Sequence, residues 1–133
     1  MNVVDSSAWL EYFADGPNAD YFAPPIEDTK SLIVPTISVL EVFKVILRER
    51  GEDDALQATA LLRQGQIADL SEDIAIQAAT LGHDHKLPLA DSVIYATAQK
   101  YKAQLWTQDE HFKDLPGVNY KEKIKPARSS DAP

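Results

Sequence analysis

The stretch NVVDSSAWLEYF, at residues 2–13, contains both kinds of element from which the fold is expected to be built. Asn2–Val4 is a short apolar run typical of a buried strand, and Asp5 follows it directly. Over Ser6–Ala14 the large apolar residues gather on one side at helical spacing, which predicts a helix. A strand that leads at once into a helix is the unit of a parallel α/β sheet, so we expect this unit to recur.

The rest of the chain repeats this alternation. Apolar runs predict further strands at 32–34, 66–70, 105–107 and 118–120, and helical patterns predict helices at 36–50, 52–64, 71–83 and 90–102. A short helical turn is expected at 19–22, ahead of Pro24 and Pro25. The sequence therefore predicts one α/β domain over residues 1–120, with a central parallel sheet of four to five strands flanked by helices on both faces.

The helix at 36–50 differs from the others in its composition. Thr36 is its expected cap and Gly51 its expected end. Apolar residues lie nearly all round it, which predicts deep burial.

The composition fits a globular domain without cross-links. The chain has 133 residues, 44% of them apolar, and no cysteine, which excludes disulfides, thiolate metal sites and cysteine nucleophiles. No apolar run approaches the ~20 residues of a membrane-spanning helix, and no basic and apolar signal opens the chain. We therefore expect a cytoplasmic protein that does not associate with membranes.

The net charge of −8 argues against a broad surface for nucleic acid, which is normally basic. A carboxylate metal site would account for part of this charge, because bound cations cancel it. Residues 121–133 carry four basic and two acidic residues and show no periodicity. We expect them to form a flexible basic tail.

Four acidic residues stand where a parallel sheet would place a site. Open α/β sheets bind their ligands at the carboxyl ends of the strands. Asp5 directly follows the first predicted strand, and Asp109 lies two residues past the strand at 105–107. Asp91 lies at the start of a predicted helix, and Glu41 lies inside the most apolar one. These four carboxylates could converge at one edge of the sheet.

Structural roles for the same residues remain open at this level. Asp5 and Asp109 could be helix caps, and Asp91 could complement a helix dipole. Thr107 and Glu110 have the spacing of a capping box. Glu41 could form an ion pair one helical turn away, with Lys44 or Arg48.

Four motifs nevertheless resemble, in order and spacing, the acidic motifs of PIN domains: VVDSS at 3–7, SVLEV at 38–42, LADSVIYA at 89–96 and LWTQDEHF at 105–112. They are most similar to the VapC toxins of bacterial and archaeal toxin–antitoxin pairs, over about residues 1–120. The resemblance implies a ribonuclease that depends on Mg²⁺ or Mn²⁺. It also implies an acidic quartet of Asp5, Glu41, Asp91 and Asp109, with Asp5 and Asp91 as the main metal ligands.

The resemblance carries further expectations about the site and its partners. Ser6, Ser7 and Thr107 would orient a ligand, a water or a phosphate. Many relatives carry another acid two positions after the last Asp, where this chain has His111, which leaves a second metal position open to Glu110 or Asp114. The implied partners are an RNA substrate, a cognate antitoxin and a second copy of the chain in a homodimer.

Two other classes of protein fit parts of the pattern. A response-regulator receiver agrees in size, acidity and fold class, and Lys125-Pro126 resembles its Lys-Pro pair. Receivers, however, carry two adjacent acids after the first strand, where this chain has Ser6 and Ser7 after its single Asp. The second alternative is a PIN-like module without catalytic activity that binds a protein partner.

Overall fold

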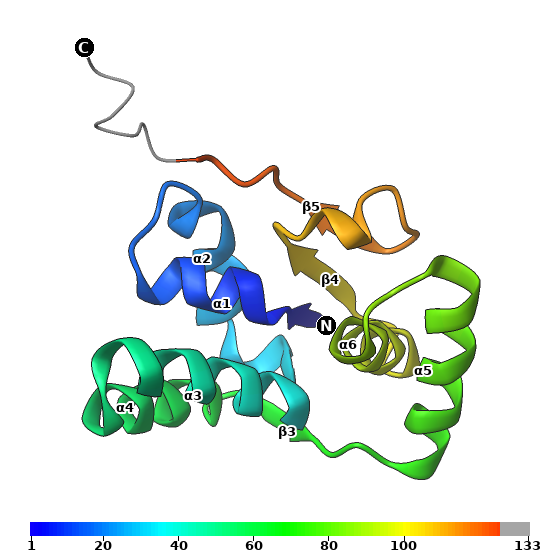
Figure 1. The fold of residues 1–133 in the computed structure, drawn as a ribbon, viewed down its shortest axis with the longest axis horizontal. Helices are drawn as coiled ribbons and strands as arrows, with labels where there is room; N and C mark the ends of the chain where they lie inside the picture. The colour runs from blue at the N-terminus through cyan, green and yellow to red at the C-terminus, as the bar shows by residue number, and fades with distance from the viewer. Residues whose placement is uncertain (126–133) are drawn as a thin grey trace.

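The computed structural model describes residues 1–125, and its centre is a five-stranded sheet in which all neighbouring strands run parallel (Figure 1). The strands are β1 (Asn2–Val4), β2 (Leu32–Pro35), β3 (Gln66–Ala68), β4 (Gln104–Thr107) and β5 (Val118–Tyr120). They lie in the order β3-β2-β1-β4-β5. The predicted α/β class with a parallel sheet is confirmed.

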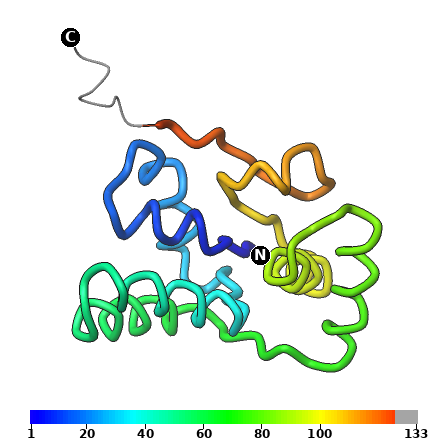
Figure 2. Tube along the Cα trace, in the orientation of Figure 1, coloured from blue at the N-terminus to red at the C-terminus, as the bar shows by residue number. Residues whose placement is uncertain are grey.

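Helices cover both faces of this sheet, as predicted (Figures 1 and 2). The helices are α1 (Ser6–Phe13), α2 (Ala19–Glu27), α3 (Thr36–Arg50), α4 (Glu52–Leu62), α5 (Glu72–His85) and α6 (Leu89–Lys100). Two short 3₁₀ helices are η1 (Thr29–Ser31) and η2 (Glu110–Phe112). The first four helices lie on one side of the sheet, α6 covers the other side, and α5 packs against α6.

Alternation along the strands explains why both faces are buried. Val4, Leu32 and Val34 point into the core beneath α1 to α4. Val3 and Ile33 point the opposite way, into the core beneath α6. Because successive side chains of a strand leave on opposite faces, a continuous apolar run makes a strand that is buried on both sides.

The strand order reverses between β1 and β4, and we call the region beyond the carboxyl ends of these two strands the crevice. The chain adds β2 and β3 on one side of β1 and then crosses over to place β4 on the other side. Ligand sites of open α/β sheets lie at such a reversal, beyond the carboxyl ends of the strands. The observed order also differs from the 2-1-3-4-5 order of receivers. Within residues 1–125, no helix has the length and apolar character needed to cross a bilayer.

The predicted deep burial of α3 is wrong. Only Ser38, Val42 and Ile46 of this helix are buried, whereas Leu40 is 58% and Leu47 is 44% exposed. Ile37, Val39 and Phe43 are half-buried and pack against the two cores, so the helix contacts the domain along one side while Leu40 and Leu47 face outward. Its predicted cap is also wrong, because Thr36 is already helical and Pro35 occupies the cap position without a side-chain hydrogen bond.

The short turn predicted at 19–22 is instead a helix of nine residues that continues through Pro24 and Pro25. Each proline removes one backbone donor from the helix. The buried side chains of Phe22 and Ile26 pack into the core of α1 to α4, and this burial offsets the missing hydrogen bonds.

Helices α5 and α6 approach each other closely at Gly82. A Cβ atom at this position would lie 2.5 Å from the Ser92 Oγ atom of α6. The Ser92 hydroxyl donates to the carbonyl of Pro88, at the start of α6, over 2.9 Å. The absence of a side chain at Gly82 therefore lets α5 press on the first turns of α6, next to Asp91.

Candidate metal centre

Asp5 lies at the carboxyl end of β1 and is almost completely buried. It caps α1, with the Ala8 N–H donating to its Oδ1 atom over 3.3 Å, and the Ser7 hydroxyl donates to the same oxygen over 2.8 Å. Burial raises the pKa of Asp5 to about 7, although hydrogen bonds from Ser7, Ala8 and Thr107 oppose the shift. Capping and a place in the site are thus compatible for this residue.

Asp109 follows β4 and faces the same crevice. Its Oδ1 atom accepts the N–H of His111 over 2.9 Å, which makes it the cap of η2. The Asp109 N–H in turn donates to the Thr107 hydroxyl over 2.9 Å. Thr107, which is fully buried, therefore contacts the backbone of one acid and the carboxyl group of Asp5. The capping box of Thr107 and Glu110 is not the arrangement found, because Asp109 caps this turn.

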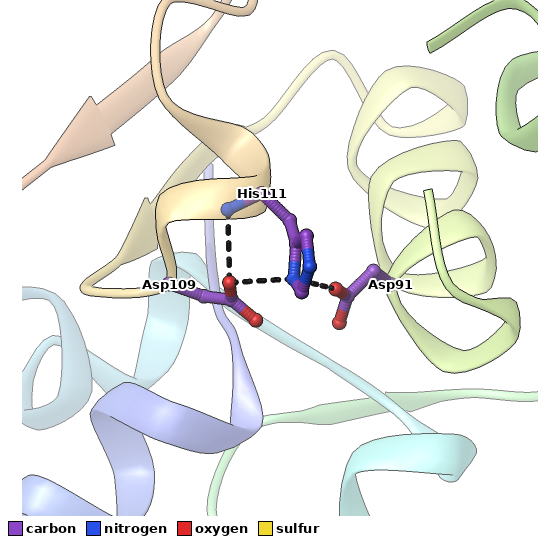
Figure 3. A group of neighbouring side chains, drawn as sticks. All are labelled: Asp91, Asp109 and His111. Carbon is purple, nitrogen blue, oxygen red and sulfur yellow. Dashed lines mark hydrogen bonds and ion pairs between the residues drawn. The ribbon is translucent and has the colours of Figure 1, made fainter. Parts of the chain in front are cut away.

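Asp91 lies in the first turn of α6, and Figure 3 shows its carboxyl group turned toward Asp109 across the ring of His111. The His111 Nδ1 atom is 2.8 Å from Asp109 Oδ1 and 3.3 Å from Asp91 Oδ2. The pKa of Asp91 is raised to about 7, first by burial and then by the charges of Asp109 and Glu41, while His111 opposes the shift.

Glu41 approaches the same crevice from α3. The Ser6 hydroxyl donates to its Oε1 atom over 2.7 Å. Neither Lys44 nor Arg48 pairs with Glu41 within residues 1–125, and Arg48 instead pairs with Glu49. The ion pair that the sequence left open is therefore not formed in the part of the chain that the structure describes.

His111 is the one basic side chain in ion-pair contact with these acids within residues 1–125. Among the described residues, no lysine or arginine forms an ion pair with any of the four acids. One donor atom each from Asp91, Asp109 and His111 lie within 4.8 Å of one another. Crowded carboxylates that are partly removed from water are costly unless a cation joins them. The donor set therefore fits a divalent ion.

Only two of the four predicted acids belong to the closest group of possible metal donors. Asp91 and Asp109 belong to the compact group of donors. Asp5 and Glu41 lie beside this group: the charge of Asp109 acts on Asp5, and the charge of Glu41 acts on Asp91. Ser6 and Ser7 orient Glu41 and Asp5 rather than standing free. His111 is the member of the donor group to which the sequence assigned no role.

A cavity of about 520 Å³ adjoins this group. Its lining includes Ser7, Asp109, Lys123 and Lys125. A buried amide pair holds the last described residues beside it, because the Asn18 amide donates both to the Gln108 side chain over 3.1 Å and to the Glu122 carbonyl over 2.9 Å. Acidic and basic side chains therefore share one opening.

Comparisons with known proteins identify the family and the fold of the chain. Residues 3–118 match the PIN domain family. A toxin–antitoxin complex from Klebsiella pneumoniae contains a chain 25% identical to this one, with a TM-score of 0.76 and coverage of 90% of this chain and 96% of that one. VapC20 of Mycobacterium tuberculosis, a sarcin–ricin loop cleaving toxin, is 18% identical with a TM-score of 0.72 over 87% of this chain and 95% of its own.

One curated protein shares a shorter segment. Polyribonucleotide nucleotidyltransferase of Hyphomonas neptunium is 36% identical over 74 residues, which is 56% of this chain. The chain spans only about a tenth of the length of that relative. The family match extends over nearly all of the described residues. The chain therefore belongs to the PIN domain family, and its fold matches the VapC toxins of toxin–antitoxin complexes.

Proposed function

We propose that this protein is a metal-dependent endoribonuclease and the toxin of a toxin–antitoxin pair. The observation that carries the proposal is the group of carboxylates at the reversal of strand order, where neither lysine nor arginine of residues 1–125 neutralises them. Membership of a nuclease family and the likeness to toxins give this group its expected chemistry.

Each acid has a distinct part in the proposed site. Asp5 and Asp91 are the main ligands of Mg²⁺ or Mn²⁺, and Glu41 and Asp109 bind directly or through water. The ion would supply an activated water and neutralise charge on the phosphodiester. Hydrogen bonds from Ser6 and Ser7 hold two of the carboxylates in place, so these hydroxyls act by orienting ligands.

The proposed substrate and partners are supported by the cavity beside the acids and by the similarity to a chain of a toxin–antitoxin complex. An RNA phosphate could enter the cavity between the acids and the two lysines at its rim, since lysine ammonium groups attract phosphate. The Klebsiella pneumoniae protein was solved in a toxin–antitoxin complex, which supports a cognate antitoxin for this chain. We extend the proposal to a homodimer that acts in the cytoplasm.

The test is cleavage of single-stranded RNA by protein freed of metal with EDTA, with and without added Mn²⁺ or Mg²⁺. Cleavage should require the ion and should be lost in Asp109→Asn. Asp73→Asn is the matched control, because it makes the same change at an exposed acid that pairs with Lys100 and lies outside the donor group. Cleavage that survives EDTA, or that both variants share with the wild type, would reject the proposal. Absence of both cleavage and metal binding would favour a PIN-like module without catalytic activity.

A further inference from the structure

The position of His111 is set by the residues on either side of it in the sequence. Its backbone N–H donates to Asp109, and the next residue, Phe112, is fully buried and packs against Tyr95. The ring itself is about half exposed. The short η2 helix therefore holds the imidazole at the mouth of the crevice while one edge of the ring stays open to water.

A hydrogen bond alone explains this placement poorly. The Nδ1 atom lies 2.8 Å from an oxygen of Asp109 and 3.3 Å from an oxygen of Asp91. A single ring nitrogen carries at most one hydrogen, so it can donate a strong hydrogen bond to only one of the two carboxylates. The Oδ1 atom of Asp109 also accepts the His111 N–H already. The second carboxylate is left without an equivalent donor.

The spacing of the three donors instead suits one shared ion. Ligands that bind a small divalent ion at about 2.1 Å lie about 3 Å apart when they are adjacent in an octahedron. The two nitrogen-to-oxygen distances fall on either side of that value. Figure 3 shows the ring of His111 between one oxygen of Asp109 and one oxygen of Asp91. The three donor atoms lie within 4.8 Å of one another, so one ion could contact all of them after small side-chain rotations.

We propose that the imidazole of His111 is a direct ligand of the metal, in the place where many relatives offer an acid, and that this nitrogen makes the site prefer a first-row transition ion over Mg²⁺. The proposal rests on the metal site of the proposed function and adds a ligand and a selectivity to it. Imidazole suits transition ions, whereas Mg²⁺ favours an all-oxygen shell. The site should therefore bind Mn²⁺ in preference to Mg²⁺.

Pulsed electron paramagnetic resonance of bound Mn²⁺ tests the ligand directly. The wild-type protein should show coupling of Mn²⁺ to a histidine ring nitrogen. Growth with ¹⁵N-labelled histidine should change the frequency of this coupling without any substitution. The His111→Asp variant should lose it and still bind Mn²⁺, whereas His83→Gln, which removes an exposed histidine of α5, should keep it.

Titration calorimetry with Mn²⁺ and with Mg²⁺ tests the selectivity. The ratio of the two affinities should fall about tenfold or more in His111→Asp and stay unchanged in His83→Gln. Binding of Mn²⁺ that Asp91→Asn abolishes, without any coupling to nitrogen in the wild type, would overturn the proposal and leave the metal site intact. Absence of Mn²⁺ binding altogether would reject the proposed function as well.

Discussion

Two aspartates, Asp73 and Asp91, both lie in the first turn of a helix but differ in exposure, in their charged neighbours and in the direction of their pKa shifts. Asp73 opens α5, is exposed, and pairs with Lys100 over 2.8 Å. Asp91 opens α6, is only 13% exposed, and faces Asp109 and Glu41. The hydrogen bond from Lys100 lowers the pKa of Asp73 to about 2, whereas burial raises that of Asp91 to about 7.

The contrast separates an exposed acid that pairs with a lysine from a largely buried acid that lies among other carboxylates and contacts His111. Both residues would complement a helix dipole equally well. Asp91 differs from Asp73 because it is largely buried and lies near other carboxylates, not because of its place in the helix. Perturbed acids of this kind concentrate at functional sites.

The largest effect is expected on catalysis. Asp91→Asn should lower the rate of RNA cleavage by about a hundredfold or more, because loss of a direct metal ligand should cost at least as much as loss of a residue that only supports one. Asp73→Asn makes the same chemical change on the neighbouring helix and should leave the rate unchanged. Initial rates on one labelled RNA measure both. Equal rates for the two variants would show that Asp91 matters no more for cleavage than the exposed Asp73.

The next effect concerns stability in the presence of metal. A ligand that binds only the folded state at about 100 times its dissociation constant adds about 2.7 kcal/mol to the free energy of unfolding. For a chain of this size, that raises the melting temperature by about 10 °C. Mn²⁺ should produce this rise in the wild type and in Asp73→Asn but not in Asp91→Asn. A rise of the same size in all three proteins would place the ion elsewhere.

Without metal, stability should fall as the pH rises. The pKa of Asp5 is raised to about 7, so its folded form keeps a proton that the unfolded form loses near pH 4. The free energy of unfolding should therefore decrease by a few kcal/mol between pH 5 and pH 7.5, with Asp91 contributing in the same direction. The lowered pKa of Asp73 acts only below about pH 4, so this residue contributes nothing in that range.

Urea unfolding in EDTA at the two pH values measures this fall. The variant Asp5→Asn keeps a good helix cap and cannot ionise, so its stability should change less with pH than that of the wild type. An equal change in both proteins would show that Asp5 is ionised normally in the folded state.

The smallest effect is expected at the exposed pair. Lys100→Met removes the partner of Asp73, but exposed ion pairs contribute little and are screened by salt. The variant should cleave RNA at the wild-type rate, and any loss of thermal stability should vanish at high salt. A loss of activity would mean that the charge of Lys100 also affects the acids around Asp91.

Local patterns in the sequence predicted most of the fold. Apolar runs, and breaks at glycine and proline, located most helices and strands to within a few residues, but the predicted end of α2 before Pro24 is wrong. The burial of individual side chains was harder to predict, because it depends on residues distant in the chain. The apolar surface of α3 is left half uncovered, and the helix through Pro24 and Pro25 persists because the core receives Phe22 and Ile26.

The candidate site was predictable in part for the same reason. The likeness to PIN domains named four acids, and the strand order explains why Asp5 and Asp109 share an edge. The contact between Asp91 and His111 joins residues 20 positions apart, and it depends on how α6 and η2 meet after the crossover. No periodicity encodes that meeting, so the role of His111 required the structure.

The close approach at Gly82 has a consequence for genetics. Any side chain there would meet the Ser92 hydroxyl and push α5 away from the turn that carries Asp91. In a selection for cells that survive induction of the gene, inactivating changes should therefore arise at this glycine as well as among the acids. Such survivors would contain folded protein with every carboxylate in its sequence intact.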